Sequence, residues 1–277
     1  MKKILSLISC AAIIAASVTS FSSCGNKNDS NQLKVGLECA YPPFNWTQID
    51  NSNGAVPISG TKEFAGGYDV EIAKKIAEGM GKELVIVKTE WDGLPQGVQS
   101  GVLDVIIAGM SPTEERKKTI DFSDNYYNSD LILVIKKGSK YENAKTIQDF
   151  SGAKVTAQLN TFHYTVIDQI NGVKKEAAMD NFPAMRVALE SGMIDAYVAE
   201  KPEGISIESA NPTLTYVSFD EGTGFEASEE DTAIAVGYKK GNKELGDQIN
   251  KILAGISEEE RIELMDNAIK NQPVAQE

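Results

Sequence analysis

The chain has 277 residues, a formal net charge of −13 at neutral pH and three cysteines. Such an acidic chain is poorly suited to bind nucleic acid or an anionic membrane surface, so we expect no nucleic-acid partner. The length allows a large hydrophobic core and suits a protein of two lobes.

The N-terminus has the pattern of a secretory signal. Lys2 and Lys3 precede an apolar stretch that begins at Ile4 and ends at about Val18, and small residues follow. A positive end, a short apolar segment and a small-residue cleavage site are typical of a signal peptide. The stretch is short for a membrane span, which needs roughly 20 apolar residues. We therefore expect residues 1–23 to be a signal peptide and the rest of the chain to be soluble.

The cleavage region also resembles the lipobox of bacterial lipoproteins, in which a cysteine becomes the first residue and carries diacylglycerol. Ser22-Ser23-Cys24-Gly25 carries this resemblance. Phe21 stands where lipoproteins prefer Leu, which leaves an ordinary signal peptide as the alternative. Residues 24–32 are predicted to form a lipid-anchored flexible tether. Two acyl chains on Cys24 would hold the protein stably on the outer face of the cell membrane.

Apart from the acylation of Cys24, we expect no structural role for the cysteines. Cys10 leaves with the signal peptide and Cys24 would be acylated, so Cys39 remains alone. We expect no intramolecular disulfide.

Strand and helix signals alternate in the first part of the chain. A short strand is predicted over 33–37, and a helix capped by Asp69 runs to Glu78 with an outward pair between Glu71 and Lys75. Further along, the pattern predicts a strand over 84–87, a helix from Asp92 to Ser100-Gly101 and a buried strand over 102–108. A stretch over 47–64 is expected to be a surface loop at one edge. The alternation indicates an α/β fold with mostly parallel sheets flanked by helices.

A second cycle of the same kind follows. It comprises predicted strands over 154–157, 193–199 and 232–238, and helices over 161–170 and 181–191. Asn242 is expected to cap a further helix, and Ser257 with Glu260 to form a capping box for the last one.

The two cycles resemble each other in sequence. Ser100-Gly101-Val102-Leu103-Asp104 matches Ser191-Gly192-Met193-Ile194-Asp195, and Lys34-Val35 matches Lys154-Val155. This repeat suggests two lobes of similar build. We expect lobe 1 to comprise residues 31–129 plus 219–277 and lobe 2 residues 130–218. Two crossings, near 128–130 and 217–220, would form a hinge.

Candidate binding residues follow the predicted strands. Ligands of open α/β sheets bind beyond the carboxyl ends of the strands. The loops there contain Glu38, Tyr41, Phe44 and Trp46; Gly109, Met110, Ser111 and Arg116; Asn160, Thr161, Phe162 and His163; and Glu200. An arginine that can pair with a carboxylate and an acid that can pair with an ammonium suit a zwitterion.

Several segments together resemble extracellular solute-binding protein family 3, the polar amino acid receptors of bacterial ABC importers. They are Val35-Gly36, Tyr41-Pro42-Pro43-Phe44, Gly66-Gly67-Tyr68-Asp69-Val70-Glu71-Ile72-Ala73, Glu90-Trp91-Asp92-Gly93-Leu94, Ile106-Ile107-Ala108-Gly109-Met110-Ser111-Pro112-Thr113-Glu114-Glu115-Arg116 and Ile120-Asp121-Phe122-Ser123-Asp124. The resemblance implies the two-lobed periplasmic-binding-protein type 2 fold and a binding protein rather than an enzyme, with no cofactor and no metal.

The resemblance also implies a role for individual residues. Arg116 corresponds to the arginine that holds the ligand carboxylate, and Glu200 to the acid, usually Asp, that binds the ammonium. Thr161 corresponds to a second carboxylate site at the start of a helix, where the dipole favours an anion. The remaining implied contacts are Ser111 with the backbone of Ala108, Gly109 and Met110, and the aromatic pair Tyr41 and Trp91 around the ligand's carbon chain.

This chain departs from the family pattern in the second-lobe loop. The usual Gly, two Thr or Ser, and Gln are replaced by Asn160-Thr161-Phe162-His163, and Phe162 and His163 are expected to reshape the pocket. His163 is the only histidine, so it cannot build a metal site; a satisfied polar role and ligand stacking both remain open. Asn160 can adopt a left-handed turn.

Each assignment also has a simpler alternative. Arg116 lies in a charge run that would ordinarily be a solvated helix face, Glu200 could form a surface ion pair with Lys201, and Tyr41 and Trp91 could be packing residues.

Glu38 carries the prediction about the ligand's side chain. If a zwitterion neutralises Arg116 and Glu200, a buried Glu38 is left unpaired, and a buried lone charge is costly. This favours a polar or basic amino acid such as lysine, arginine, ornithine or glutamine. The alternatives are that Glu38 points to solvent or pairs within the protein.

The predicted partners are a free L-amino acid and the membrane permease subunits of an ABC importer, with the receptor acting as a monomer. Two rivals remain: a sensor that reports the ligand to a membrane signalling partner, and an enzyme resembling cyclohexadienyl dehydratases. The sequence contains no evident nucleophile–base pair or phosphate loop.

Overall fold

A computed structural model describes residues 31–273. The predicted signal peptide, Cys24 and nearly all of the tether over 24–32 lie outside the described residues.

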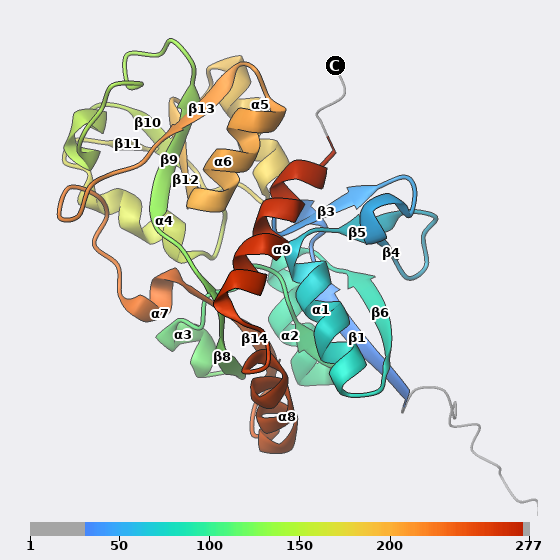
Figure 1. Cartoon of the computed structure of the whole chain (residues 1–277). Coiled ribbons are helices and arrows are strands. Elements are labelled where there is room, and N and C mark those ends of the chain that lie inside the picture. Colours follow the sequence, from blue (N-terminus) through green and yellow to red (C-terminus); the bar gives the residue numbers. More distant parts are fainter. Residues whose placement is uncertain (1–30, 274–277) are drawn as a thin grey trace, which may run out of the picture. The chain divides into compact units, whose positions relative to one another are not determined.

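Two five-stranded sheets form the framework (Figure 1). The first sheet has the strand order β6 (Glu83–Lys88), β1 (Gln32–Leu37), β7 (Val105–Ile106), β14 (Ala233–Lys239) and β8 (Ile120–Asn128). The second has the order β11 (Lys174–Lys175), β10 (Lys154–Thr156), β12 (Ala196–Glu200), β9 (Leu131–Lys136) and β13 (Leu214–Val217). In each sheet two pairings are parallel and two antiparallel. The α/β fold is confirmed. The sheets are not mostly parallel as predicted but mixed, because the strands that carry the chain between them pair antiparallel.

A small third sheet is built from a segment predicted as a loop. It has the order β2 (Ala40–Tyr41), β3 (Asn45–Gln48), β5 (Phe64–Gly66) and β4 (Val56–Pro57), with a 3₁₀ helix η2 (Ser52–Gly54). Residues 47–64 are therefore partly regular, which corrects the loop prediction. The expected position at an edge is confirmed, since Ile58 forms a bridge to Ile86 of β6.

Five helices of the described chain have ten or more residues. They are α1 (Tyr68–Gly79), α5 (Phe182–Ser191), α6 (Lys201–Ala210), α8 (Lys243–Leu253) and α9 (Glu258–Asn271). The shorter α-helices are α2 (Leu94–Ser100), α3 (Glu114–Lys117), α4 (Phe162–Val166) and α7 (Glu229–Thr232). Three further 3₁₀ helices are η3 (Trp91–Gly93), η4 (Ile147–Phe150) and η5 (Ile167–Gln169). Helix α9 contacts both α1 and α6 and so packs beside helices from both halves of the chain (Figure 1).

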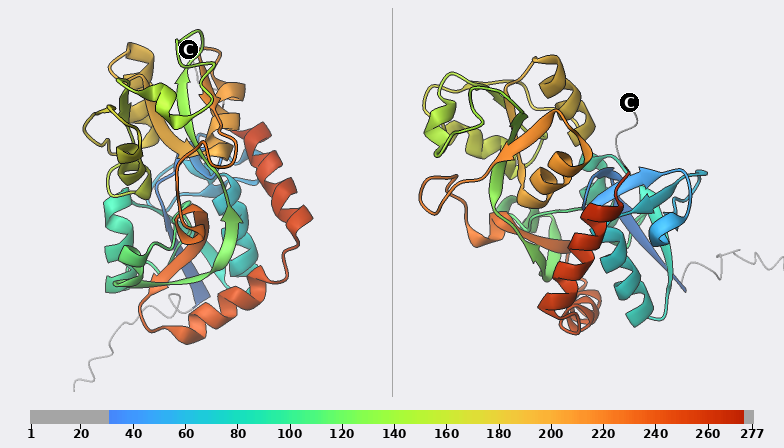
Figure 2. Two further views of the ribbon diagram at one scale, coloured as in Figure 1. Left: turned by 90° about the vertical axis from the view of Figure 1, so that its left-hand side faces the viewer. Right: turned by 45° about the horizontal axis from the view of Figure 1, so that its top comes forward.

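The chain passes between the two sheets twice. Strand β8 leads directly into β9, and the return path runs from β13 through α7 to β14 (Figure 2). The two paths touch where the Ser129 N–H donates to the Thr232 carbonyl at 3.1 Å. Phe219 and Phe225 pack against the core of the second sheet. These contacts favour a second crossing after residue 225, and the lobe boundaries at 129/130 and 218/219 stay predictions.

The sequence repeat corresponds to the same hydrogen bond in both halves of the chain, between an aspartate side chain and the backbone at the start of a strand. The Asp104 carboxylate accepts a hydrogen bond from the Lys34 N–H at 2.8 Å, and the Asp195 carboxylate accepts one from the Lys154 N–H, also at 2.8 Å. Gly101 and Gly192 both end their helices in the left-handed conformation, with φ of 81° and 77°. The two cycles are therefore built alike.

Several local predictions are wrong. Helix α1 begins after Gly67, and Asp69 is not its cap: the carboxylate is buried and accepts from Tyr126 Oη at 2.7 Å and Asn45 Nδ2 at 2.8 Å. Glu71 forms its ion pair with Lys74, one residue before the predicted partner Lys75.

The ends of other elements also differ from the prediction. Val102 and Met193 are exposed because the strands they were assigned to, β7 and β12, begin three residues later. Ser257 caps α9 as expected, accepting from the Glu260 N–H at 3.2 Å, while the Glu260 carboxylate binds Lys75.

Candidate functional site

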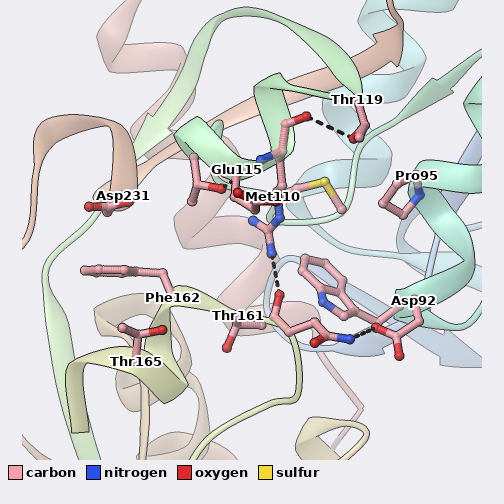
Figure 3. A pocket seen from close by; sticks show the side chains of 13 residues that line it. Asp92, Pro95, Met110, Glu115, Thr119, Thr161, Phe162, Thr165 and Asp231 are labelled. Carbon is pink, nitrogen blue, oxygen red and sulfur yellow. Dashed lines mark hydrogen bonds between the residues drawn. The ribbon is translucent and has the colours of Figure 1, made fainter. Parts of the chain in front are cut away.

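The loops that follow the strands meet at two adjoining pockets. The outer pocket has a volume of about 680 Å³ and is lined by Trp91, Asp92, Pro95, Met110, Thr113, Glu115, Arg116, Thr119, Asn160, Thr161, Phe162, Thr165 and Asp231. The inner pocket is lined by Tyr41, Trp91, Ala108, Gly109, Ser111, Arg116, Gln158, Thr161, Phe162, His163 and Phe182. Figure 3 shows Thr161, Phe162 and Thr165 opposite Met110, Glu115 and Thr119 across the outer pocket.

The structure brings nearly all the predicted site residues together here. Tyr41, Trp91, Ala108, Gly109, Met110, Ser111, Arg116, Thr161, Phe162 and His163 line one or both pockets. Glu38 and Glu200 stand behind this lining and are bonded to residues in it. Phe44 and Trp46 are buried packing residues.

The guanidinium of Arg116 links a loop that follows a strand of the first sheet to a loop that follows a strand of the second. Arg116 lies in α3, where Thr113 caps the helix and orients the first turn. Nη1 donates to the Ser111 carbonyl at 2.9 Å, Nη2 donates to the Asn160 carbonyl at 3.1 Å, and the group lies 4.9 Å from the centroid of the Trp91 ring. Burial lowers the pKa of Arg116 to about 10, which still leaves it charged at neutral pH. A solvated charge run is therefore the wrong interpretation of Arg116.

Glu200 ends β12 and is buried, so a surface ion pair with Lys201 is excluded. Its Oε2 accepts a hydrogen bond from the Tyr41 hydroxyl, and its Oε1 lies 3.1 Å from His163 Nε2. Burial raises the pKa of Glu200 to about 8. The carboxyl group is thus contacted by Tyr41 of β2 and His163 of α4 and is protonated easily near neutral pH.

His163 lies in the first turn of α4 and is buried. Burial, followed by the positive charge of Arg116, lowers the pKa of His163 to about 3. The contact with Glu200 therefore involves a neutral imidazole and is not an ion pair. Among the described residues, His163 Nδ1 has no hydrogen-bond partner.

Glu38 is buried and paired within the protein. Gln158 Nε2 donates to both of its carboxylate oxygens, at 3.0 Å and 3.2 Å. Burial raises the pKa of Glu38 to about 7; the Gln158 hydrogen bond opposes this shift, and the nearby charges of Glu90 and Asp92 add to it. Of the alternatives that the sequence left open, pairing within the protein is the one that occurs.

Two residues that line the inner pocket were not predicted from the sequence. Gln158 follows β10, and Phe182 opens α5, where its ring stacks on Tyr41 with centroids 3.8 Å apart. The strand-end rule could have found Gln158, which precedes Asn160 by two residues. Nothing in the sequence indicates that Phe182 reaches Tyr41.

Local backbone geometry explains the loop around Thr161. Asn160 adopts the expected left-handed conformation, with φ of 56°, and Nδ2 donates to Asp92 Oδ1 at 2.8 Å. Thr161 Oγ1 donates to the Gln158 carbonyl at 2.7 Å. Helix α4 has only five residues, so its dipole contributes little to anion binding at Thr161. Any such role would rest on hydrogen bonds from Thr161 itself.

Gly109 is required by the close approach of Tyr41. Its φ is 62°, and a Cβ atom there would lie 3.2 Å from the Tyr41 ring. This conformation brings the Gly109 backbone to the wall of the inner pocket.

Within residues 31–273, no helix combines the length and hydropathy that a membrane span requires. The described residues also contain no group of three or more His, Cys, Asp or Glu side chains that could hold a metal ion.

Comparison with known proteins gives consistent matches. The L-cystine-binding protein TcyJ of Escherichia coli strain K12 is 29% identical over 256 residues, covering 91% of this chain and 88% of that protein. The arginine-binding extracellular protein ArtP of Bacillus subtilis is 27% identical over 272 residues, covering 95% and 96%. A crystal structure of the amino acid ABC transporter substrate-binding protein AbpA of Streptococcus pneumoniae, bound to L-arginine, superposes with a TM-score of 0.74 at 28% identity, covering 87% of this chain and 95% of that one.

The model for bacterial extracellular solute-binding proteins, family 3, matches residues 33–268, which is most of the described chain. The two-sheet architecture and the pockets at the strand ends agree with that match, and these relatives are binding proteins rather than enzymes. The chain belongs to the bacterial extracellular solute-binding proteins, family 3.

Proposed function

We propose that this protein captures a polar or basic amino acid where the inner and outer pockets adjoin and delivers it to an ABC importer. The observation that carries the proposal is the position of Arg116: its guanidinium borders both pockets, is half-buried, and has carbonyl oxygens as its hydrogen-bond partners. Because those partners are neutral, a ligand carboxylate can still neutralise the charge.

The second anchor in the proposal is Glu200 on the other sheet. An α-ammonium beside this carboxyl group would favour its ionised form and lower its pKa from about 8. Arginine and acid together match the opposite charges of a free amino acid. Tyr41 and Trp91, which line the inner pocket, would then contact the carbon chain.

The side-chain preference rests on Glu38. This buried carboxyl group accepts its hydrogen bonds from Gln158, a residue that lines the inner pocket. A cationic or donor-rich ligand side chain would supply further donors. Relatives named for arginine and cystine are compatible with such a pocket but do not choose among its ligands.

Capture would occur by closure of the two halves of the chain. A ligand that touches both halves favours the closed arrangement by its differential affinity for it. Micromolar binding requires about −8 kcal/mol. Two shielded, charge-assisted anchors and aromatic contact are of the right order to supply this.

The proposal includes a lipid anchor at Cys24 and action as a monomer beside the permease subunits. The lipobox resemblance of Ser22-Ser23-Cys24-Gly25 supports the anchor. Radiolabelled palmitate should be incorporated into the wild-type chain, and Cys24→Ala should abolish labelling and release the protein from the cell surface. Labelling that persists in Cys24→Ala would contradict the anchor.

A thermal-shift and calorimetry panel of the common amino acids tests the ligand. A ligand at 100 times its Kd should stabilise the protein by about 2.7 kcal/mol. We expect arginine, lysine, ornithine or glutamine to give the largest shift. Strongest binding of aspartate or glutamate would overturn the side-chain preference, and the absence of any amino acid binding would overturn the function itself. Loss of uptake of the bound amino acid on gene deletion separates delivery to an importer from sensing.

A further inference from the structure

His163 presents an unused acceptor beside the inner pocket. The side chain is 7% exposed and belongs to the pocket lining. Its Nε2 is engaged with Glu200 Oε1 at 3.1 Å, whereas Nδ1 is buried and has no hydrogen-bond partner among the described residues. Buried polar atoms in proteins are nearly always paired. Three buried side-chain atoms of the described residues are unpaired, Ser139 Oγ, Tyr141 Oη and His163 Nδ1, and of these only His163 belongs to a residue that lines the inner pocket.

The ring's protonation follows from its neighbours. A neutral imidazole has one donor and one acceptor nitrogen. When a ligand ammonium lies beside Glu200, that carboxyl group is ionised and needs a donor, so Nε2 carries the hydrogen. Nδ1 is then the bare acceptor, and it requires an N–H or O–H group.

The partner of Nδ1 cannot be either charged end of the amino acid. The two nitrogens of an imidazole point away from each other, so the ammonium held at Glu200 beyond Nε2 does not also reach Nδ1. The carboxylate held by Arg116 is an acceptor and would repel the Nδ1 lone pair. The remaining part of the ligand is its side chain.

We propose that His163 is a specificity-determining residue whose Nδ1 accepts a hydrogen bond from the side chain of the bound amino acid, so that the pocket selects side chains with an N–H donor. This inference rests on the proposed function and adds a selecting group to it. Guanidinium, ammonium and primary amide side chains satisfy Nδ1. Aliphatic and ionised acidic side chains leave it unpaired, which is the kind of penalty that gives a binding site its selectivity.

Two conservative substitutions distinguish the roles of the two ring nitrogens of His163. Glutamine places an amide nitrogen near the position of Nε2, so His163→Gln keeps a donor for Glu200 and loses the Nδ1 acceptor. Asparagine reaches only as far as Nδ1, so His163→Asn keeps the acceptor and loses the contact with Glu200. The measured quantity is the ratio of Kd values for L-norleucine, which has no side-chain donor, and the tightest of L-arginine, L-lysine and L-glutamine.

The wild-type protein should prefer the donor-bearing amino acid. His163→Gln should reduce that preference about tenfold, the effect of one lost hydrogen bond to a charged group. His163→Asn should weaken all ligands while keeping the ratio within about threefold of the wild-type value. An unchanged ratio in His163→Gln, or equal loss in both variants, would overturn the assignment.

The single histidine also permits a direct spectroscopic measurement. In ligand-bound, tag-free protein labelled with ¹⁵N-histidine, the Nδ1 resonance should be that of an unprotonated nitrogen, and it should lie further upfield with L-arginine, L-lysine or L-glutamine than with L-norleucine. If the wild-type protein binds norleucine as tightly as the others, the inference fails while amino acid capture stands. If it binds none of the four, the proposed function fails and the inference with it.

Discussion

The side-chain amide of Gln158 bridges to both carboxylate oxygens of Glu38, at 3.0 Å and 3.2 Å. Glu38 follows β1 of the first sheet and Gln158 follows β10 of the second, so this pair ties together loops from the two halves of the chain. The same amide nitrogen donates to the Asp180 carbonyl at 2.9 Å, which fixes its orientation.

Gln158→Leu should therefore destabilise the protein. It leaves the buried Glu38 carboxyl group without its donor, and we expect the free energy of unfolding to fall by about 1–3 kcal/mol. Urea denaturation of the two single Leu variants and of the double variant Glu38→Leu with Gln158→Leu measures the coupling. Strictly additive losses would show that the hydrogen bonds contribute nothing to stability.

Arg116→Ala should weaken amino acid binding at least about tenfold, because a charge-assisted anchor is lost. Arg116→Lys should recover only part of the affinity, since an ammonium cannot reproduce the planar fork. Lys117→Ala is the matched control: Lys117 is the next residue of α3 and pairs with Glu114 and Glu230 at the surface. Equal losses in the Ala variants, measured by calorimetry, would argue against a specific carboxylate anchor.

The pKa of Glu200 predicts a pH dependence of stability. Because burial raises this pKa from 4.5 to about 8, the folded protein binds more protons at Glu200 than the unfolded chain does between those values. The contribution of Glu200 is therefore fully present below about pH 4.5 and is lost as the pH rises through 8. Glu200→Gln cannot titrate, so the Tm of the wild-type protein relative to this variant should fall from pH 4.5 to pH 8. A constant difference in Tm would contradict the raised pKa.

Ligand binding should release a proton at the same residue. A bound ammonium favours ionised Glu200, so affinity should increase as the pH rises toward about 8. Calorimetry at pH 6 in buffers of different ionisation enthalpy measures the release directly. Glu200→Gln should abolish the proton release if Glu200 is the residue that loses the proton.

The Arg186–Glu203 pair should be far more important for stability than a surface pair. Arg186 Nη2 lies 2.7 Å from Glu203 Oε2, the Glu203 side chain is fully buried, and the Tyr197 hydroxyl also donates to it at 2.8 Å. Arg186→Met leaves a buried carboxylate without its cation and should cost about 3–5 kcal/mol.

Lys175→Met is the matched control for that change. It removes the half-buried Lys175 ammonium from exposed Asp168 and from the Tyr164 ring 4.2 Å away, and should cost about 0–1 kcal/mol. Similar costs for the two substitutions in chemical denaturation would contradict the importance of burial.

Much of the site was predictable because its residues follow a positional rule. Strand ends placed Tyr41, Ser111, Arg116 and Glu200 at one edge, and the repeat around Asp104 and Asp195 indicated two similar halves. The partners of the buried acids were not predictable. Asp69 looked like a helix cap, but its hydrogen bonds come from Asn45 and Tyr126, and this depends on long-range packing.

The length of a strand could not be predicted from the sequence pattern either. The apolar run over 102–108 contains only two residues of β7, because pairing with β1 and β14 sets its length and hydrophobicity does not. The Phe182–Tyr41 stack likewise requires β2 and the start of α5, which are far apart in the sequence, to pack against each other.

The position of β14 between β7 and β8 has a consequence for how the protein is made. During translation every strand of the second sheet, ending at Val217, emerges before Ala233, where β14 begins. The second sheet can thus pair completely while the first still lacks an inner strand, and the edge of β7 stays open until the last part of the chain arrives. A ribosome that stops short of β14 releases a half-finished receptor with an exposed sheet edge, which is a substrate for chaperones and proteases.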